Sequence, residues 1–266
     1  MRLPSRPARL AVLAVLALLA VRLLLPTACA KRNEGTLDRI RRTQVINVGT
    51  DATYPPFDSV DPATGAVVGY DMDIARAIAR TLGAQARFQV VPFDGIIAGL
   101  KTGKYEMIAS AMTITPERAR QVTFTQPYAL AGQAVAVRSD ETRIADASDL
   151  GGLRIGCQLG TTGEMEAKKI PGAKVVSFDA IGAAFRDLEN RNLDAVIADI
   201  PTTHIFAHDH PTIRLAGEPI TREEFGFAVR LADADLAKAL DGALTSVRAS
   251  GEMQRIADAW GVTLPQ

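Results

Sequence analysis

The stretch DMDIARAIARTLGAQARFQVV, residues 71–91, carries a helix pattern followed by a strand pattern. From Asp71 to Leu82 the apolar residues recur three or four positions apart, which places them on one helical face. A β-rich run, 45–49, comes before this helix, and another, 86–91, follows it. A strand, a helix and a second strand of these lengths predict a crossover unit with parallel strands.

The same alternation continues through the chain. Further strands are predicted at 107–109, 153–157, 174–178 and 195–198, and helices at 37–42, 94–101, from 162, at 180–190, 202–207, 233–248 and 253–261. Two such series, joined around 131–137, predict two α/β lobes with parallel sheets. Ligands bind beyond the carboxyl ends of strands in such sheets, so the candidate loops follow Gly49, Ala109, Gln158 and Ala198.

The composition is that of a globular protein. Of the 266 residues 47% are apolar, and the contents of glycine and proline exclude a disordered or collagen-like chain. The chain has 30 basic and 30 acidic residues, but four arginines and no acid stand in the first 28 positions, which leaves the remainder with a net charge of −4. We therefore expect no nucleic-acid partner.

The first 29 residues are predicted to be an export signal. Three arginines precede an unbroken apolar run, Leu10–Val21, which Arg22 interrupts. The run has the length of a signal peptide, whereas a membrane span needs about 20 clean apolar residues. We expect the rest of the protein in the periplasm or on the extracellular face of the cytoplasmic membrane.

Two kinds of processing fit this segment. Residues 28–30 have the small-x-small pattern of ordinary cleavage, and residues 26–29 are similar to a lipobox, in which Cys29 becomes the lipid-bearing first residue. We favour lipidation of Cys29 and hence anchoring to the membrane, because the other cysteine, Cys157, lies in an apolar strand pattern as a buried thiol. Residues 30–35 would then form a linker.

A basic residue stands at a predicted helix start in the third loop. Thr115 suits the N-cap and Pro116 the first helical position, which places Arg118 in the first turn. A guanidinium, hydroxyls and free backbone N–H groups at a helix start suit a carboxylate. The alternative is a surface arginine paired with Glu117 or Asp94.

An acidic residue ends a predicted apolar strand. Asp199 stands where it can meet an ammonium group, and its alternative role is the N-cap of a helix beginning near Pro201. Residues 160–164 provide a second nest of N–H donors at a helix start. Tyr54 and Phe93 lie in neighbouring loops, with plain core packing as their alternative.

Five motifs in this order and spacing resemble the family 3 extracellular solute-binding proteins of polar amino-acid ABC transporters. The motifs are Thr50-Asp51 through Pro55-Pro56-Phe57, Gly69-Tyr70-Asp71-Met72-Asp73-Ile74 with Ile78-Ala79 and Leu82, Phe93-Asp94-Gly95-Ile96-Ile97, Thr113 through Arg118, and Gly160-Thr161-Thr162. The resemblance extends from about residue 37 to residue 262.

This resemblance implies a type II periplasmic-binding-protein fold, an α/β architecture with two lobes joined by two hinge crossings. The first lobe would comprise residues 36–134 and 228–266, and the second residues 135–227. The implied function is to bind a polar amino acid and to deliver it to the permease subunits of an ABC importer. We expect a monomer without a cofactor or a bound metal.

The histidine- and lysine/arginine/ornithine-binding members also imply roles for eight residues. The α-carboxylate would be bound by Arg118, helped by Ser110, Thr113 and Thr162. The α-ammonium would be bound by Asp199, with Ser110 as a further acceptor. The ligand's side chain would lie between Tyr54 and Phe93, with Asp51 toward its far end. Two aromatic faces and a carboxylate favour a cationic side chain first, a neutral polar one second and an acidic one last.

Two other function classes fit parts of the sequence. A cyclohexadienyl or arogenate dehydratase shares this scaffold and uses a glutamate after the Gly-Thr turn, where Glu164 stands, but Asp199 favours an amino acid's ammonium group. A metal site is the other alternative, from His204, His208, Asp209 and His210. We reject it as the main function, because nothing nearby supplies a further ligand.

Overall fold

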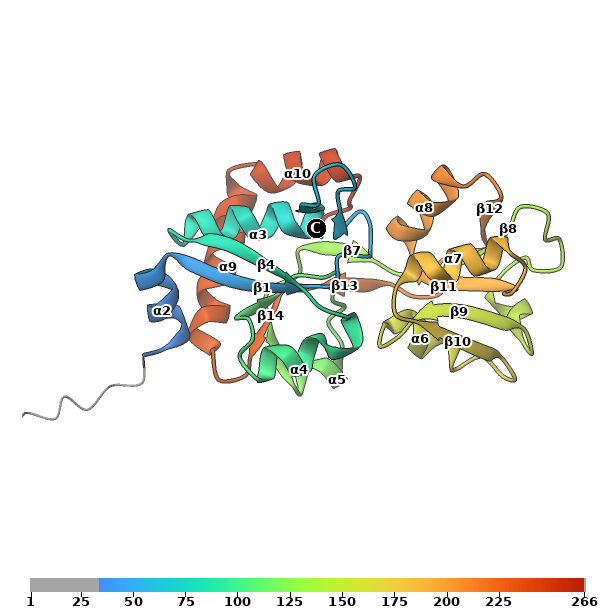
Figure 1. The fold of residues 1–266 in the computed structure, drawn as a ribbon, viewed down its shortest axis with the longest axis horizontal. Coiled ribbons are helices and arrows are strands. Elements are labelled where there is room, and N and C mark those ends of the chain that lie inside the picture. Colours follow the sequence, from blue (N-terminus) through green and yellow to red (C-terminus); the bar gives the residue numbers. More distant parts are fainter. Residues whose placement is uncertain (1–33, 266) are drawn as a thin grey trace, which may run out of the picture. The chain divides into compact units, whose positions relative to one another are not determined.

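The computed structural model describes residues 34–265. The predicted export signal, the predicted lipidation site Cys29 and most of the predicted linker lie outside these residues. The strands of the described part form two five-stranded sheets, and helices pack against each sheet (Figure 1). Within this part, no helix is both long and apolar enough to span a membrane.

The first sheet has the strand order β4-β1-β5-β14-β6. Its strands are β1 (Val45–Thr50), β4 (Gln85–Val90), β5 (Met107–Ile108), β6 (Val122–Phe124) and β14 (Ala228–Arg230). β1 pairs in parallel with β4 and β5, whereas β14 runs antiparallel to β5 and β6. The accompanying helices are α2 (Thr36–Thr43), α3 (Tyr70–Thr81), the 3-10 turn η1 (Phe93–Gly95), α4 (Ile96–Lys101), α5 (Pro116–Ala119), α9 (Ala234–Ala249) and α10 (Glu252–Trp260).

The second sheet has the strand order β10-β9-β11-β8-β12. Its strands are β8 (Gln133–Arg138), β9 (Arg154–Gln158), β10 (Lys174–Phe178), β11 (Ala195–Asp199) and β12 (Ile213–Ala216). β9 runs parallel to β10 and β11, whereas β8 runs antiparallel to β11 and β12. Its helices are the 3-10 turn η2 (Ala147–Leu150), α6 (Thr162–Ala167), α7 (Ile181–Glu189) and α8 (Ile200–Asp209).

The chain passes between the two sheets twice. β7 (Ala129–Ala131) leads from the first sheet into β8, and β13 (Glu223–Phe225) leads back into β14 (Figure 1). β7 and β13 pair antiparallel, with Glu223 opposite Ala131. A small hairpin of β2 (Ser59–Val60) and β3 (Val67–Val68) completes the strands. The predicted fold class, two α/β units connected by two crossings, is confirmed.

The prediction of purely parallel sheets was wrong, since both sheets are mixed. The antiparallel members β8 and β14 each enter their sheet directly from a crossing segment. No crossover helix precedes them, so the direction of the crossing sets their direction. β8 (six residues) and β14 (three residues) each follow a crossing strand and not a crossover helix, so the alternation of strands and helices did not indicate them.

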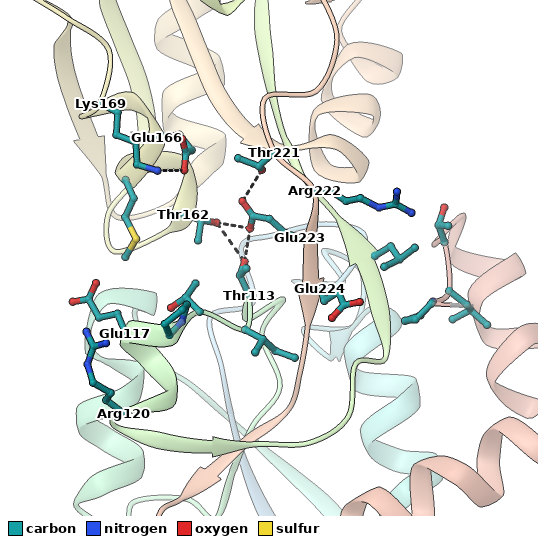
Figure 2. Close-up of a pocket in the computed structure, with 18 residues that line it drawn as sticks. Thr113, Glu117, Arg120, Thr162, Glu166, Lys169, Thr221, Arg222, Glu223 and Glu224 are labelled. Atoms are coloured by element: carbon teal, nitrogen blue, oxygen red, sulfur yellow. Dashed lines mark hydrogen bonds and ion pairs between the residues drawn. The ribbon is translucent and has the colours of Figure 1, made fainter.

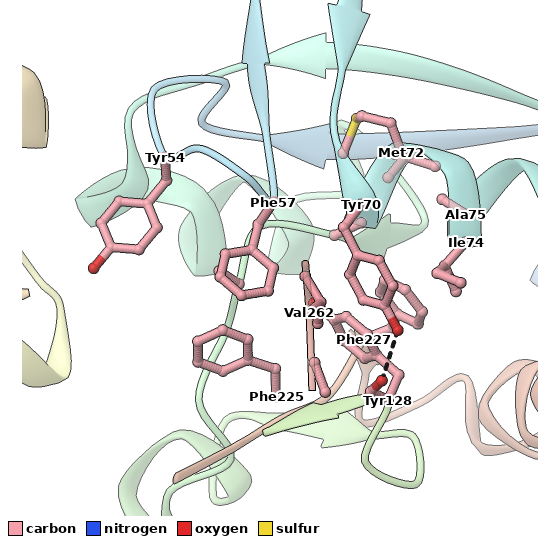
Figure 3. Close-up of a cluster of buried hydrophobic side chains, with 14 of the residues drawn as sticks. Tyr54, Phe57, Tyr70, Met72, Ile74, Ala75, Tyr128, Phe225, Phe227 and Val262 are labelled. Atoms are coloured by element: carbon pink, nitrogen blue, oxygen red, sulfur yellow. Dashed lines mark hydrogen bonds between the residues drawn. The ribbon is translucent and has the colours of Figure 1, made fainter. Parts of the chain in front are cut away.

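An aromatic cluster packs around the start of α3 and the second crossing (Figure 3). The ring of Phe57 meets Phe225 edge to face at 5.0 Å, and Tyr128 stacks on Phe227 at 4.0 Å. Phe57 is fully buried, as expected of a core residue. Tyr54 lies at the margin of the cluster, and Figure 3 shows its hydroxyl directed away from the other rings. The ring of Tyr54 is therefore held by the core while its polar end is available to a site.

Candidate functional site

A small pocket lies among the loops that follow the strands of both sheets. Its side chains nearly close it, and the free volume of about 10 Å³ would hold about one water molecule. Seven of the eight residues predicted from the sequence line it, namely Tyr54, Phe93, Ser110, Thr113, Arg118, Thr162 and Asp199. Ala111, Gln158 and Thr161 complete the lining. The loops after β1, β5, β9 and β11 thus converge, as their position at carboxyl ends of strands predicts.

Arg118 enters the pocket from the start of α5. Thr115 caps this helix by accepting a hydrogen bond from the N–H of Arg118 (3.1 Å), and Pro116 is the first helical residue. The guanidinium donates through Nη1 to the carbonyl of Thr113 (2.9 Å) and through Nη2 to the carbonyl of Gly160 (3.0 Å). The second of these bonds joins a loop of the first sheet to a loop of the second.

The charge of Arg118 is buried without an ion pair. The residue is 4% exposed, and no carboxylate of residues 34–265 lies within ion-pair distance of it, so the surface pair considered as an alternative is not formed. Burial lowers the pKa of Arg118, while more distant carboxylates act in the opposite direction. The ring of Phe93 lies 5.4 Å from the guanidinium carbon. A buried guanidinium with unused donors fits the carboxylate of a ligand.

Asp199 is the anionic counterpart, at the end of β11. It occupies the N-cap position of α8, but its side chain makes no capping hydrogen bond. Instead Oδ2 accepts from the hydroxyl of Tyr54 (2.8 Å) and Oδ1 accepts from Nε2 of Gln133 (3.0 Å). The hydroxyl of Tyr54 in turn accepts from the backbone N–H of Asp199 (3.0 Å).

The carboxylate of Asp199 also lacks a cationic partner within the described part of the chain. It is 4% exposed. The pKa of Asp199 is raised to about 7, mainly by burial and further by the nearby carboxylate of Glu223. The hydrogen bonds from Tyr54 and Gln133 act in the opposite direction and lower this pKa. A ligand ammonium beside Asp199 would stabilise its charged form.

Ser110 has its only hydrogen engaged. Its hydroxyl donates to Oδ2 of Asp58 (2.5 Å) and accepts from the backbone N–H of Asp51 (2.9 Å). A lone pair remains for an ammonium, but no donor remains for a carboxylate. Of the two roles that the resemblance implies for Ser110, this geometry favours the ammonium acceptor.

Asp58 and Asp71 hold the pocket loops from behind. Oδ1 of Asp58 accepts from the N–H of Tyr54 (3.0 Å), and burial raises the pKa of Asp58 to about 6. Oδ2 of Asp71 accepts from the N–H of Ala111 (2.7 Å) and from the hydroxyl of Tyr128 (2.8 Å). Ala111 has a φ of +45°, a conformation that is unfavourable for residues other than glycine and that the bond to Asp71 stabilises.

Asp51, the eighth predicted residue, does not line the pocket itself. Its Oδ2 accepts from the hydroxyl of Thr53 and from Nε2 of Gln158 (2.8 Å), and Gln158 does line the pocket. Burial raises the pKa of Asp51, against these hydrogen bonds. The side chain therefore holds its own loop, as an aspartate in a turn readily does, and also joins that loop to the second sheet. Its contact with a ligand side chain stays a prediction.

Glu164, the candidate acid of a dehydratase, faces away from the pocket lining. Oε2 accepts from the N–H of Gly160 (3.0 Å), and Oε1 accepts from the hydroxyl of Ser177 (2.6 Å) and pairs with Nζ of Lys168 (2.8 Å). Burial alone would raise the pKa of Glu164. The bonds from Lys168, Ser177 and Gly160 have the larger combined effect, and the pKa lies below its ordinary value. A carboxylate in this state supports a loop and does not hold a proton for catalysis at neutral pH.

The histidine group proposed as a metal alternative is spread over the end of α8. His208 Nδ1 lies 2.8 Å from Asp209 Oδ1, and His210 Nδ1 lies 3.2 Å from Glu189 Oε2. Among residues 34–265 there is no group of three or more side chains that could hold a metal ion. The histidines therefore supply no site that competes with the pocket.

Three residues around the pocket were not predicted, namely Gln133, Gln158 and Glu223. Gln133 donates to Asp199 and also, through the same Nε2, to the hydroxyl of Thr162 (3.0 Å). Glu223 accepts from the hydroxyls of both Thr113 and Thr162. Glu223 belongs to the crossing strand β13, and Gln133 begins β8 directly after the crossing strand β7. The sequence pattern did not reveal these strands. Gln158 ends a predicted strand, and that position was the available signal for it.

Comparison with known proteins places the chain in a family. Residues 46–263 match the family model of bacterial extracellular solute-binding proteins, family 3. The chain is 37% identical to ABC transporter arginine-binding protein 1 of Escherichia coli (strain K12), over 81% of this chain and 90% of that protein. It is similar to a crystal structure of the P235GK mutant of ArgBP from T. maritima, with a TM-score of 0.81 and 37% identity over 84% of this chain and 98% of that one. An ancestral arginine-binding protein bound to arginine matches with a TM-score of 0.79 and 37% identity, over 82% of this chain and 98% of that one. These relatives are named as arginine-binding proteins, and the protein belongs to the family 3 bacterial extracellular solute-binding proteins.

Proposed function

We propose that this protein binds a free cationic L-amino acid, with L-arginine as the first candidate, and delivers it to an ABC importer. One observation carries the proposal. Arg118 and Asp199 line the same pocket, are both buried, and form no ion pair with residues 34–265. A free amino acid brings an α-carboxylate and an α-ammonium, and neither charge leaves water cheaply without a partner.

The preference for a cationic side chain rests on the surrounding charge. Arg118 is the only basic residue among the described residues that line the pocket. The carboxylate of Asp199 also lines it, and the carboxylates of Asp51, Asp58 and Glu223 lie beside or behind the lining. A guanidinium or ammonium side chain would reduce this excess of negative charge, whereas a glutamate would increase it. The names of the arginine-binding relatives support a cationic side chain as the first choice. Neutral polar side chains rank second and acidic ones last.

Binding would draw the two lobes together, with the first at residues 36–134 and 228–266 and the second at 135–227. Hydrogen bonds from Tyr54 to Asp199 and from Arg118 to Gly160 already cross between the loops of the two sheets. A ligand held by Arg118 from one side and Asp199 from the other adds two stronger links. Closure on the ligand would report occupancy to the permease subunits.

The protein would act outside the cytoplasmic membrane. The family supports this location, and the sequence supports residues 1–29 as an export signal with Cys29 as the lipid-bearing anchor. Mass spectrometry of the mature protein from membranes tests the anchor. A mature chain that begins at a diacylated Cys29 is expected, and an unmodified N-terminus after Ala30 would contradict it.

A thermal-shift panel of the twenty amino acids tests the function. A ligand stabilises the folded state by RT ln(1 + [L]/Kd), so ligands at equal concentration rank by affinity. Arginine and lysine should raise the melting temperature most, glutamine less, and glutamate and aspartate least. No shift with any amino acid, or a larger shift with glutamate than with arginine, would contradict the proposal.

A further inference from the structure

The carboxylate of Glu223 makes three hydrogen bonds at the second crossing. Oε2 accepts from the hydroxyl of Thr113 (2.7 Å) and from the hydroxyl of Thr162 (2.8 Å), while Oε1 accepts from the hydroxyl of Thr221 (2.7 Å) (Figure 2). Thr113 follows β5 of the first sheet, and Thr162 begins α6, which follows β9 of the second sheet. One oxygen atom of Glu223 therefore links the two sheets.

The two threonines form a wall between two hollows. Both line the pocket with Arg118 and Asp199, and both also line a larger groove on the other side, where Glu223 lies (Figure 2). Their hydroxyl oxygens are 3.3 Å apart, and the residues are only 4% and 7% exposed. Glu223 thus contacts the pocket wall from behind and does not line the pocket.

The hydrogen bonds fix where the hydroxyl hydrogens point. A carboxylate only accepts, so Thr113 and Thr162 each direct their single hydroxyl hydrogen toward Glu223 and away from the pocket. The second contact of Thr162 is consistent with this, because its oxygen accepts from Nε2 of Gln133 (3.0 Å). The remaining lone pairs can accept from a ligand N–H, but the hydroxyls have no hydrogen left for a ligand carboxylate.

We propose that Glu223 is a positioning residue of the binding site, which latches the two sheets behind the pocket and sets both threonine hydroxyls as acceptors. This role of Glu223 rests on the proposed function. It assigns the hydroxyls of Thr113 and Thr162 to the nitrogen-bearing part of a bound amino acid, and it leaves the ligand's carboxylate to Arg118. The negative charge of Glu223 also acts on the pocket, since it favours the charged form of Arg118.

Glu224 provides a matched control. It is the next residue of β13, carries the same charge and lines the same groove, but it is exposed and makes none of the threonine contacts. Glu223→Gln separates charge from hydrogen bonding, because its amide oxygen can still accept from both threonines while its NH₂ group donates to Thr221. Glu223→Ala removes all three bonds.

The test is calorimetric titration of L-arginine into the wild type, Glu223→Ala, Glu223→Gln and Glu224→Ala, with dissociation rates from stopped flow. We expect Kd to rise at least tenfold in Glu223→Ala, mainly through faster dissociation, and to stay within about threefold in the other two variants. If the hydrogen bonds of Glu223 matter only for folding, Glu223→Ala will have a lower melting temperature and a Kd within twofold of the wild type. That result would overturn the proposal.

A second readout does not depend on arginine. Small-angle scattering of the ligand-free proteins should give a larger radius of gyration for Glu223→Ala than for the wild type and Glu224→Ala. If the wild type binds no amino acid, the proposed function is wrong. The radii of gyration alone then test whether Glu223 holds the two sheets together. Equal radii for all three proteins would then contradict it.

Discussion

The hydroxyl of Tyr54 and the carboxylate of Asp199 are joined by a 2.8 Å hydrogen bond, although the two residues are 145 positions apart in the chain. Tyr54 follows a strand of the first sheet and Asp199 ends a strand of the second. The same hydroxyl accepts from the N–H of Asp199 (3.0 Å), so the pair is tied twice. Tyr54 therefore both links the sheets and orients the buried carboxylate toward which an ammonium would bind.

Tyr54→Phe should weaken the binding of L-arginine. The variant leaves a buried carboxylate with one hydrogen bond fewer, a loss of about 1–3 kcal/mol, or roughly 5- to 150-fold in Kd. Titration calorimetry measures the change. Tyr70→Phe is the matched control, because the hydroxyl of Tyr70 bonds only to the carbonyl of Tyr128 inside the aromatic cluster. It should lower stability and leave Kd unchanged; equal effects of the two variants on Kd would show that Tyr54 has no special role.

Arg118→Ala should abolish measurable binding while the protein stays folded. The loss of a charge-assisted contact with a desolvated carboxylate amounts to about 3 kcal/mol or more, which is a factor of at least 100 in Kd. Arg120→Ala is the control, since Arg120 follows the same short helix but is exposed and does not line the pocket. Near-native affinity of Arg118→Ala in calorimetry would remove Arg118 from the site.

The stability of the ligand-free protein should fall as the pH rises toward 7. The pKa of Asp199 is about 7 in the folded protein against an ordinary value of 3.8. The folded state therefore binds more protons between these values than the unfolded state does. The free energy of unfolding then decreases by up to about 1.4 kcal/mol per pH unit for this group, and its contribution is constant above the folded pKa.

Denaturant unfolding of the ligand-free protein at pH 5, 6 and 7 checks this slope. Asp199→Asn should flatten it, and most clearly between pH 6 and 7, because the pKa of Asp58 is raised to about 6 and contributes at lower pH. Asp209→Asn, which changes an exposed carboxylate on α8, should keep the wild-type slope. Parallel slopes for the wild type and Asp199→Asn would contradict the assignment.

Glu164→Gln should leave the affinity for L-arginine within about threefold, because Glu164 supports the Gly160 loop and does not line the pocket. The wild type should show no dehydration of prephenate or arogenate, followed by absorbance of the aromatic product. The variant loses the ion pair with Lys168, whose side chain is exposed, but keeps an amide that can still bond to Gly160 and Ser177. Turnover in the wild type that disappears in Glu164→Gln would overturn the binding function.

The charged ends of the site could be predicted because local sequence determines them. Thr115 and Pro116 define a helix start, which fixes Arg118 in its first turn, and an apolar strand ends at Asp199. Both are properties of a few consecutive residues. The position of these loops at the carboxyl ends of strands then brought them together, as the topology requires.

The partners of these residues could not be predicted, because long-range packing determines them. Gln133 lies 66 positions from Asp199, and Glu223 lies 110 positions from Thr113. Glu223 lies on the crossing strand β13, and Gln133 begins β8 directly after the crossing strand β7, so neither follows a crossover helix. Likewise, nothing in the local sequence indicates that Ser110 donates its hydrogen to Asp58. The direction of a hydroxyl depends on its neighbours in space.

The central claim is that Arg118 and Asp199 bind the two charges of a free amino acid, and one titration series tests it most directly. L-Arginine is compared with agmatine, which lacks the α-carboxylate, and with 5-guanidinovaleric acid, which lacks the α-ammonium. Each analogue leaves one buried charge of the pocket unpaired, a cost of about 3 kcal/mol or more. The account predicts that L-arginine binds at least 100-fold more tightly than either analogue. Binding of agmatine or of 5-guanidinovaleric acid within a few fold of L-arginine would contradict it.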